Sequence, residues 1–159
     1  MEEKKYAVLI DGDNISSKYL DSILNEMTKY GIATYKRIYC DFTSQQSSKW
    51  RRLVRDSGIQ AMQQFANTVG KNATDSTLII DAMDILYTGN VDGFCIVSSD
   101  GDFTRLAIRL KESGMDVIGM GESKTPRSFR AACTVFTDLE ILYEAESEDD
   151  EISTKGKKP

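Results

Sequence analysis

The segment YAVLIDGDN, residues 6–14, determines the fold that we expect for this chain. Its unbroken apolar run lacks the alternation of a half-exposed strand and is typical of a strand covered on both faces. The segment FCIVSSDGD, residues 94–102, has the same order, with an apolar run followed by aspartate and glycine. The two runs are shorter than a helix and contain β-branched residues, which favours strands. They predict two central strands of a parallel sheet.

Other apolar runs alternate along the chain with segments of helical period. We predict strands at residues 6–11, 33–40, 59–65, 93–99, 116–120 and 135–136. We predict helices at residues 17–30, 49–55, 74–89, 102–114 and 127–133, the first of them ending at Gly31 as a C-cap. Strands that alternate with helices form a parallel sheet with helices on its faces, so the pattern predicts an α/β fold.

The composition sets limits on domain number. The chain has 159 residues, 40% of them hydrophobic, which is enough for one core. Six of the 25 acidic residues follow residue 143, in a stretch without apolar period. We therefore expect one domain over residues 1–143 and an acidic, then basic, disordered tail or linker over residues 144–159.

The chain contains no histidine, which excludes Ser-His-Asp and Cys-His nucleophile pairs and His-ligated metals. Any catalysis must depend on carboxylates. The three cysteines form no CxxC pair, and an odd thiol is typical of a reducing compartment. With no apolar stretch of about 20 residues and no signal-peptide pattern, we expect a cytoplasmic protein that does not interact with membranes.

Aspartates follow both central strands at the point where each strand ends. Asp11 follows the first run, and Asp100 and Asp102 follow the second. In a parallel sheet these ends meet at one edge, where ligands bind near a reversal of strand order. Asp75 lies in the first turn of a predicted helix and would approach from the side. Clustered carboxylates need a cation, and Mg²⁺ prefers oxygen ligands, so we predict a metal site that activates water for phosphodiester hydrolysis.

Each acidic cluster also has an ordinary structural explanation. Asp-Gly pairs form turns and aspartates cap helices, so a single cluster would favour a structural role. Two clusters at strand ends favour the metal site. Asp81 and Asp84 lie on other faces of the helix that carries Asp75. We expect them to face solvent or a neighbouring helix, with Asp81 available for a supporting position.

The densest basic segment, residues 49–55, lies on a short predicted helix. For Trp50 in this segment, packing in the core is favoured over stacking on a base. Lys71 is suited to a phosphate or to an acidic partner, and Arg130 lies with other basic residues near the predicted edge. The candidate phosphate-binding residues are Lys49, Arg51, Arg52, Arg55, Lys71, Lys124 and Arg127.

Taken together, these motifs resemble the NYN domain, a family of PIN-like nucleases that includes the LabA-like proteins. The resemblance rests on residues 8–15, 71–81, 95–103 and 114–119, and it spans about residues 5–141. It implies a Rossmann-like (PIN-like) α/β/α sandwich with a mainly parallel sheet, which binds Mg²⁺ or Mn²⁺ and cleaves RNA, with single-stranded RNA as the expected partner.

The family's functional positions can be placed on this sequence. Gly101 stands where many relatives carry serine, a departure that leaves the carboxylates unaffected. By resemblance, the catalytic and metal-binding positions fall on Asp11, Asp75, Asp100 and Asp102, and the supporting positions on Asn14, Ser98, Ser99 and Asp81. The pattern is also similar to bacterial members in which this domain precedes an OST-HTH (LOTUS) module for RNA binding. We expect that module to be absent from this chain, which ends in the acidic tail.

Two other functions stay open at this point. Residues 11–15 approximate the nucleophile loop of haloacid-dehalogenase-type phosphatases, in which Asp11 would be the nucleophile and Asp13 the acid/base, but Ile15 departs from that loop. A non-catalytic RNA-binding or regulatory module of the same fold would keep the acidic pocket as a scaffold. The nucleotide-binding motifs GxGxxG and the P-loop are absent.

Overall fold

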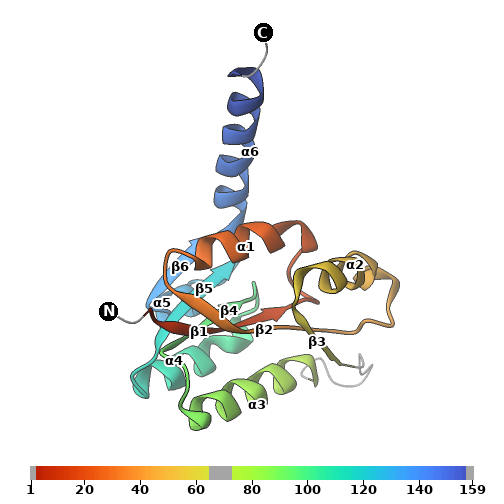
Figure 1. Ribbon diagram of the computed structural model, residues 1–159. Coiled ribbons are helices and arrows are strands. Elements are labelled where there is room, and N and C mark those ends of the chain that lie inside the picture. Colours follow the sequence, from red (N-terminus) through yellow and green to blue (C-terminus); the bar gives the residue numbers. More distant parts are fainter. Residues whose placement is uncertain (1–2, 65–72, 157–159) are drawn as a thin grey trace.

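The computed structural model describes residues 3–64 and 73–156, and for residues 73–76 and 149–156 it describes the backbone alone. Within these ranges one six-stranded sheet lies between two layers of helices (Figure 1). The expected α/β/α sandwich is confirmed. The strands are β1 (Lys5–Asp11), β2 (Ile32–Cys40), β3 (Gln60–Gln63), β4 (Gly93–Val97), β5 (Asp116–Gly121) and β6 (Val135–Asp138).

The helices divide between the two faces of the sheet. One face packs against α1 (Leu20–Met27), α2 (Ser48–Ser57) and the start of α6 (Leu139–Gly156). The other face packs against α3 (Ala73–Thr88), α4 (Thr104–Glu112) and α5 (Arg127–Ala132). Single-turn 3-10 helices precede three of them, namely η1 (Ser17–Tyr19), η2 (Gln45–Ser47) and η3 (Gly101–Phe103).

Every strand pair in the described sheet is parallel, in the order β3-β2-β1-β4-β5-β6. This is the Rossmann order, in which the direction of winding reverses between β1 and β4. The loops after these two strands leave toward opposite faces, one into α1 and the other into α4 (Figure 1). The strands that carry the predicted aspartates are therefore the pair at the switch point.

The alternation of side chains along β1 determines where Asp11 points. Val8 and Ile10 belong to the core beneath α1 and α2, whereas Ala7 and Leu9 belong to the core beneath α3 and α4. Successive side chains of a strand point to opposite faces. Asp11 continues the series of Ala7 and Leu9, and so ends β1 on the side of α3 and α4.

The first helix ends earlier than the sequence predicts. α1 stops at Met27, and Gly31 lies in the turn that leads into β2. Gly31 does not have the positive φ of a C-cap glycine, unlike Gly89 and Gly114, which follow α3 and α4. A Cβ at Gly31 would overlap the carbonyl oxygen of Lys4, so glycine is required there by close backbone approach.

Helix α6 corrects the expected tail. The helix extends through residue 156, so residues 144–156 have the regular structure that the sequence analysis did not expect. Its first turns are held by the body, because Ser22 Oγ donates to Glu146 Oε2 at 2.6 Å and Tyr19 packs edge-on against Tyr143. The remainder projects away from the sheet (Figure 1). None of the helices in the described residues is long and apolar enough to cross a membrane.

Candidate active site

Asp11 is a buried aspartate at the switch point of the sheet. It is fully inaccessible to solvent at the end of β1. Its Oδ2 accepts two hydrogen bonds, from Asn14 Nδ2 at 2.8 Å and from Ser98 Oγ at 2.7 Å. Its Oδ1 has no hydrogen-bond partner among the described residues. One oxygen of this carboxylate is thus fixed by the protein and the other is left unsatisfied.

The environment of Asp11 disfavours a bare charge. Burial raises the pKa of this carboxyl from 3.8 to about 6, although the hydrogen bonds from Ser98 and Asn14 act in the opposite direction. Charge repulsion from Asp13 and Asp100 adds to the increase. A buried acceptor without a partner is costly unless a donor or a cation satisfies it. An all-oxygen site with one unsatisfied buried carboxylate oxygen fits a hard cation such as Mg²⁺ or Mn²⁺.

Ser98 connects the two strand ends. Besides donating to Asp11, its Oγ accepts the backbone N–H of Asp100 at 3.0 Å. The Asp100 carboxylate caps η3 by accepting the N–H of Asp102 at 2.9 Å. The structure therefore places Asp11, Asn14, Ser98 and Asp100 together, with Asp102 exposed in the adjoining helical turn. Ser99 points to another loop, where its Oγ accepts the N–H of Glu122 at 3.0 Å.

The third predicted contribution is described only in part. The backbone of Asp75 lies in the first turn of α3, as expected, and α3 contacts η3. The side chain of Asp75 and the whole of Lys71 lie outside the described residues. Among the residues whose side chains are described, no three His, Cys, Asp or Glu side chains form a group that could hold a metal.

Asp81 does not face solvent or a neighbouring helix, so that expectation is wrong. Its Oδ2 accepts the hydroxyl of Tyr39 at 2.7 Å and the guanidinium of Arg37 at 3.2 Å, both on β2. Tyr39 is fully buried. Asp81 thus fixes the middle of α3 to the sheet, and its contacts are those of a structural residue. Asp84 is exposed, as expected.

Trp50 packs in the core and is only 3% exposed, as the sequence analysis favours. Its indole Nε1 donates to the carbonyl oxygens of Gly12 at 3.1 Å and Ile15 at 3.3 Å. The ring therefore fixes the loop after β1. Its neighbour Arg51 is engaged in the same way with the loop after β2: the guanidinium donates to Ser44 O at 3.0 Å, to Ser47 Oγ at 3.2 Å and to Phe42 O.

The other basic candidates differ in their availability. Arg130 is engaged by its own loop, donating to Thr125 O at 3.0 Å and Ser123 O at 2.8 Å, so it holds the turn after β5. Lys124 is exposed at that turn, and Lys49 is exposed at the start of α2. The remaining exposed candidates are Arg52, Arg55 and Arg127.

Three further polar residues, which are not among the predicted site residues, lie at the same edge. Asp41, directly after β2, accepts from Gln63 Nε2 at 2.9 Å. Glu122, directly after β5, is bound to Ser99. Gln64, directly after β3, is 5% exposed, and its side-chain atoms have no hydrogen-bond partner among the described residues. Asp41 directly follows the predicted strand at residues 33–40, so the rule that identified Asp11 and Asp100 would also have found it. Gln64 lies inside the predicted strand at residues 59–65, and Glu122 is separated from the predicted strand at residues 116–120 by Gly121, so the predicted boundaries concealed these two.

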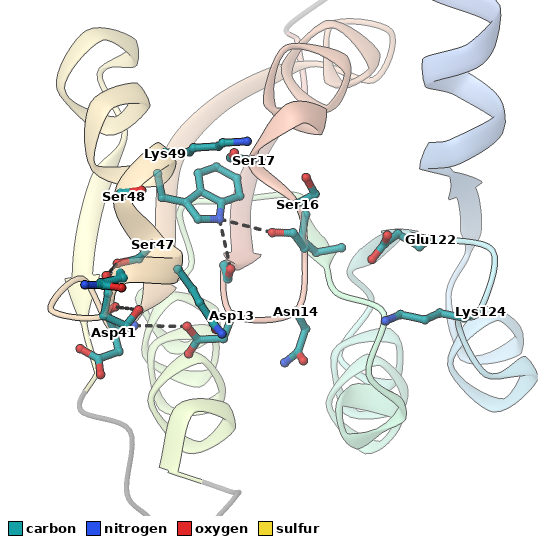
Figure 2. Close-up of a pocket in the computed structure, with 16 residues that line it drawn as sticks. Asp13, Asn14, Ser16, Ser17, Asp41, Ser47, Ser48, Lys49, Glu122 and Lys124 are labelled. Carbon is teal, nitrogen blue, oxygen red and sulfur yellow. Dashed lines mark hydrogen bonds between the residues drawn. The ribbon is translucent and has the colours of Figure 1, made fainter.

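A cavity of about 830 Å³ opens next to the loop after β1, with Asp13, Asn14 and Asp41 among its lining residues (Figure 2). Its walls are the loop after β1, the loop that leads into α2, and the turn after β5. A smaller cavity of about 240 Å³ lies against Asp100 and Gly101. Asn14 and Lys124 line both, so the two cavities adjoin at these residues.

The fold and the site define a class, an α/β domain of Rossmann strand order with aspartates at its switch point. A model of the NYN domain family matches residues 5–140, and the chain belongs to this family. Membership supports a function of the nuclease type, because the family resembles the PIN-like nucleases.

The chain is similar to other proteins in sequence and in structure. An uncharacterized protein of Methanocaldococcus jannaschii is 27% identical over 125 residues, covering 75% of this chain and 48% of that protein. The chain thus spans about half the length of this curated relative. The crystal structure of a protein of unknown function from Vibrio parahaemolyticus matches with a TM-score of 0.70 at 19% identity, covering 86% of this chain and 93% of that one. This likeness shows a shared fold.

Proposed function

We propose that this NYN domain is a metal-dependent ribonuclease that hydrolyses phosphodiester bonds of single-stranded RNA. The observation that carries the proposal is the Asp11 carboxylate, which is buried at the switch point with Oδ1 unsatisfied. A buried acceptor held in this state is a functional-site signal, because an ordinary structural aspartate would be paired or exposed.

Neighbouring side chains orient the Asp11 carboxylate. Ser98 and Asn14 both bind Oδ2, which fixes the carboxylate plane and leaves Oδ1 available. We assign Mg²⁺ or Mn²⁺ to Asp11, with Asp100, Asp102 and Asp75 as the carboxylates that would complete the site when the ion is bound, because the described side chains alone do not form a complete ligand group. A bound ion of this kind lowers the pKa of water and neutralises phosphate charge. Since the chain has no histidine, we assign a carboxylate to accept the proton of the attacking water.

The test is cleavage of end-labelled single-stranded RNA with Mn²⁺, Mg²⁺ or EDTA. The wild type is compared with Asp100→Asn, which keeps a residue that caps helices well. Asp84→Asn is the matched control, since Asp84 is an exposed aspartate on α3. We expect metal-dependent cleavage by the wild type and the control, and its loss in Asp100→Asn. Equal cleavage by all three proteins, or none by any of them, would contradict the proposal.

The same preparations separate the two alternatives. A phosphatase of the haloacid-dehalogenase type would hydrolyse a phosphomonoester and lose that activity in Asp13→Asn. Asp13 Oδ1 accepts the N–H of Asp41 at 3.3 Å, so part of this side chain is directed to β2 (Figure 2). A non-catalytic RNA-binding module would bind the labelled RNA in every variant and cut it in none.

A further inference from the structure

The cavity next to the loop after β1 has the size of a nucleotide subsite, and it adjoins the candidate metal site without being lined by Asp11, Asp100 or Asp102. Its volume of about 830 Å³ lies within the range of about 300–1,000 Å³ typical of ligand pockets. It adjoins the smaller cavity at Asp100 through Asn14 and Lys124. Asn14 is also hydrogen-bonded to Asp11. A strand with its scissile phosphate at the aspartates would therefore place the adjacent nucleotide in the larger cavity.

The walls of this cavity are fixed before any ligand binds. Trp50 holds the loop after β1 through two carbonyl oxygens, and Arg51 holds the loop that leads into α2 through three acceptors. Two consecutive residues of one helix thus secure two separate walls. A cavity secured in this way loses little conformational entropy when a ligand enters, which favours specific binding.

The chemistry of the lining excludes two common ways of binding RNA inside the cavity. Trp50 is the aromatic residue among the described lining residues, and its ring is buried, so the lining offers no stacking platform. Three carboxylates, of Asp13, Asp41 and Glu122, line the same space against two lysines, so its lining is net negative and disfavours a phosphate. The lysines Lys49 and Lys124 lie at opposite sides of the cavity in Figure 2, where phosphates can stay at its rim.

The remaining lining groups suit a sugar. Serine hydroxyls and glutamine amides both donate and accept hydrogen bonds, and the carboxylates accept them. A ribose offers hydroxyls of the same dual character, and its 2′-hydroxyl is the group that distinguishes RNA from DNA. We infer that this cavity binds the ribose of the nucleotide next to the cut and selects RNA over DNA through its 2′-hydroxyl. The inference rests on the ribonuclease proposed above.

The test combines a substrate series with a pocket variant. Each substrate is the same RNA with one ribose replaced by deoxyribose, and cleavage is measured with Mn²⁺. The variant Ser17→Ala/Ser48→Ala removes one hydroxyl from each of the two walls that Trp50 and Arg51 secure, and leaves the Trp50 and Arg51 contacts in place. Ser57→Ala, at the other end of α2, is the matched control.

We expect deoxyribose at one position beside the cut to lower kcat/KM about five- to tenfold in the wild type and in Ser57→Ala, the value of about one lost hydrogen bond. The double variant should cleave the two substrates equally. If deoxyribose lowers kcat/KM equally at every position of the strand, the inference is overturned, although the proposed ribonuclease activity is not. Complete loss of cleavage at one position in every protein would also overturn it, because that pattern marks a 2′-hydroxyl that takes part in the reaction.

If no protein cleaves RNA, the proposed ribonuclease activity is contradicted. A binding measurement can then still test the inference about the cavity. Fluorescence polarisation in EDTA then compares labelled RNA and DNA of the same sequence. Tighter binding of RNA by the wild type, with the preference lost in Ser17→Ala/Ser48→Ala, supports ribose selection by the cavity. Equal affinity for RNA and DNA in the wild type overturns it.

Discussion

The hydroxyl of Ser98 donates to Oδ2 of Asp11 across 2.7 Å, from the end of β4 to the end of the neighbouring β1. The hydroxyl oxygen of Ser98 also accepts the N–H of Asp100 at 3.0 Å. The Ser98 hydroxyl therefore sets both the orientation of the buried Asp11 carboxylate and the position of the backbone at Asp100. The two strands of the switch point are connected at the site by this side chain.

Removing the Ser98 hydroxyl should affect both stability and metal affinity. Ser98→Ala leaves a buried carboxylate short of a donor, which we expect to lower the free energy of unfolding by about 1–3 kcal/mol. Misorientation of Asp11 should weaken Mn²⁺ binding about 10- to 100-fold. Calorimetric titration with Mn²⁺ measures the second effect. Ser99→Ala is the control, because the Ser99 hydroxyl accepts the N–H of Glu122. This variant should change stability without changing Mn²⁺ affinity.

The pH dependence of stability should report the burial of Asp11. Its pKa is raised from 3.8 to about 6 in the folded protein, so the folded state retains a proton that the unfolded chain has lost between these values. The free energy of unfolding should therefore decrease as the pH rises from about 4 to about 6, by about 3 kcal/mol from this group, and then level off. Urea unfolding in EDTA checks this.

The comparison with Asp11→Asn isolates that contribution, since the other carboxyl groups titrate in both proteins. The difference in unfolding free energy between the two should change steadily from pH 4 to pH 6. Added Mn²⁺ at pH 7 should stabilise the wild type and leave Asp11→Asn unchanged. A difference independent of pH would contradict the buried, unsatisfied carboxylate.

Trp50→Phe tests the clamp on the loop after β1. The ring packing is largely retained, while the hydrogen bonds to Gly12 and Ile15 are lost, leaving two carbonyl oxygens without this donor. We expect a loss of about 1–3 kcal/mol in unfolding free energy. The wild type has one tryptophan, so its emission should be blue-shifted and protected from acrylamide. Quenching of that emission by stacking on added RNA would argue against the core position.

Gly121→Ala should disturb the candidate metal site, although Gly121 itself lies on β5 and is not one of the site residues. A Cβ at Gly121 would lie 2.6 Å from the carbonyl oxygen of Ser98 and 2.5 Å from Thr125 Oγ1, so the backbone of Ser98 must move. We expect a thermal midpoint several degrees lower, together with reduced Mn²⁺ affinity. Gly101→Ala is the milder comparison for stability: its Cβ would meet a side-chain atom, Pro126 Cγ, at 3.3 Å, so we expect a smaller decrease in the thermal midpoint.

The sequence predicts the strands well because an unbroken apolar run has few alternatives to a buried strand. Asp11 and Asp100 were found by the same reasoning, as polar residues that follow such runs. Contacts between segments that are distant in the sequence could not be predicted from it. Nothing in the local pattern around Trp50 or Arg51 indicates which loop carbonyls each will meet, and Asp81 finds its partners on a strand about 40 residues earlier.

The remaining differences have local causes. Gly31 is required by the close approach of the chain to Lys4 and does not cap α1, which ends at Met27. The segment from residue 144 is polar but is composed largely of residues that tolerate a helix, and its first turns are anchored to α1 through Ser22. Composition alone does not reveal such an anchor.

The strand order also determines how the site responds to partial opening of the molecule. The loop after β1 continues into the layer of α1, and the loop after β4 continues into the layer of α4 on the opposite face. Detachment of either layer frees one of the two loops, although the sheet between them stays paired. Such local openings need less free energy than global unfolding and are visible in amide hydrogen exchange. Asp11 stays paired to β2 in such an opening, but Asn14 and Asp100 lie in the two loops, so the hydrogen bonds around its carboxylate should be lost before the sheet opens.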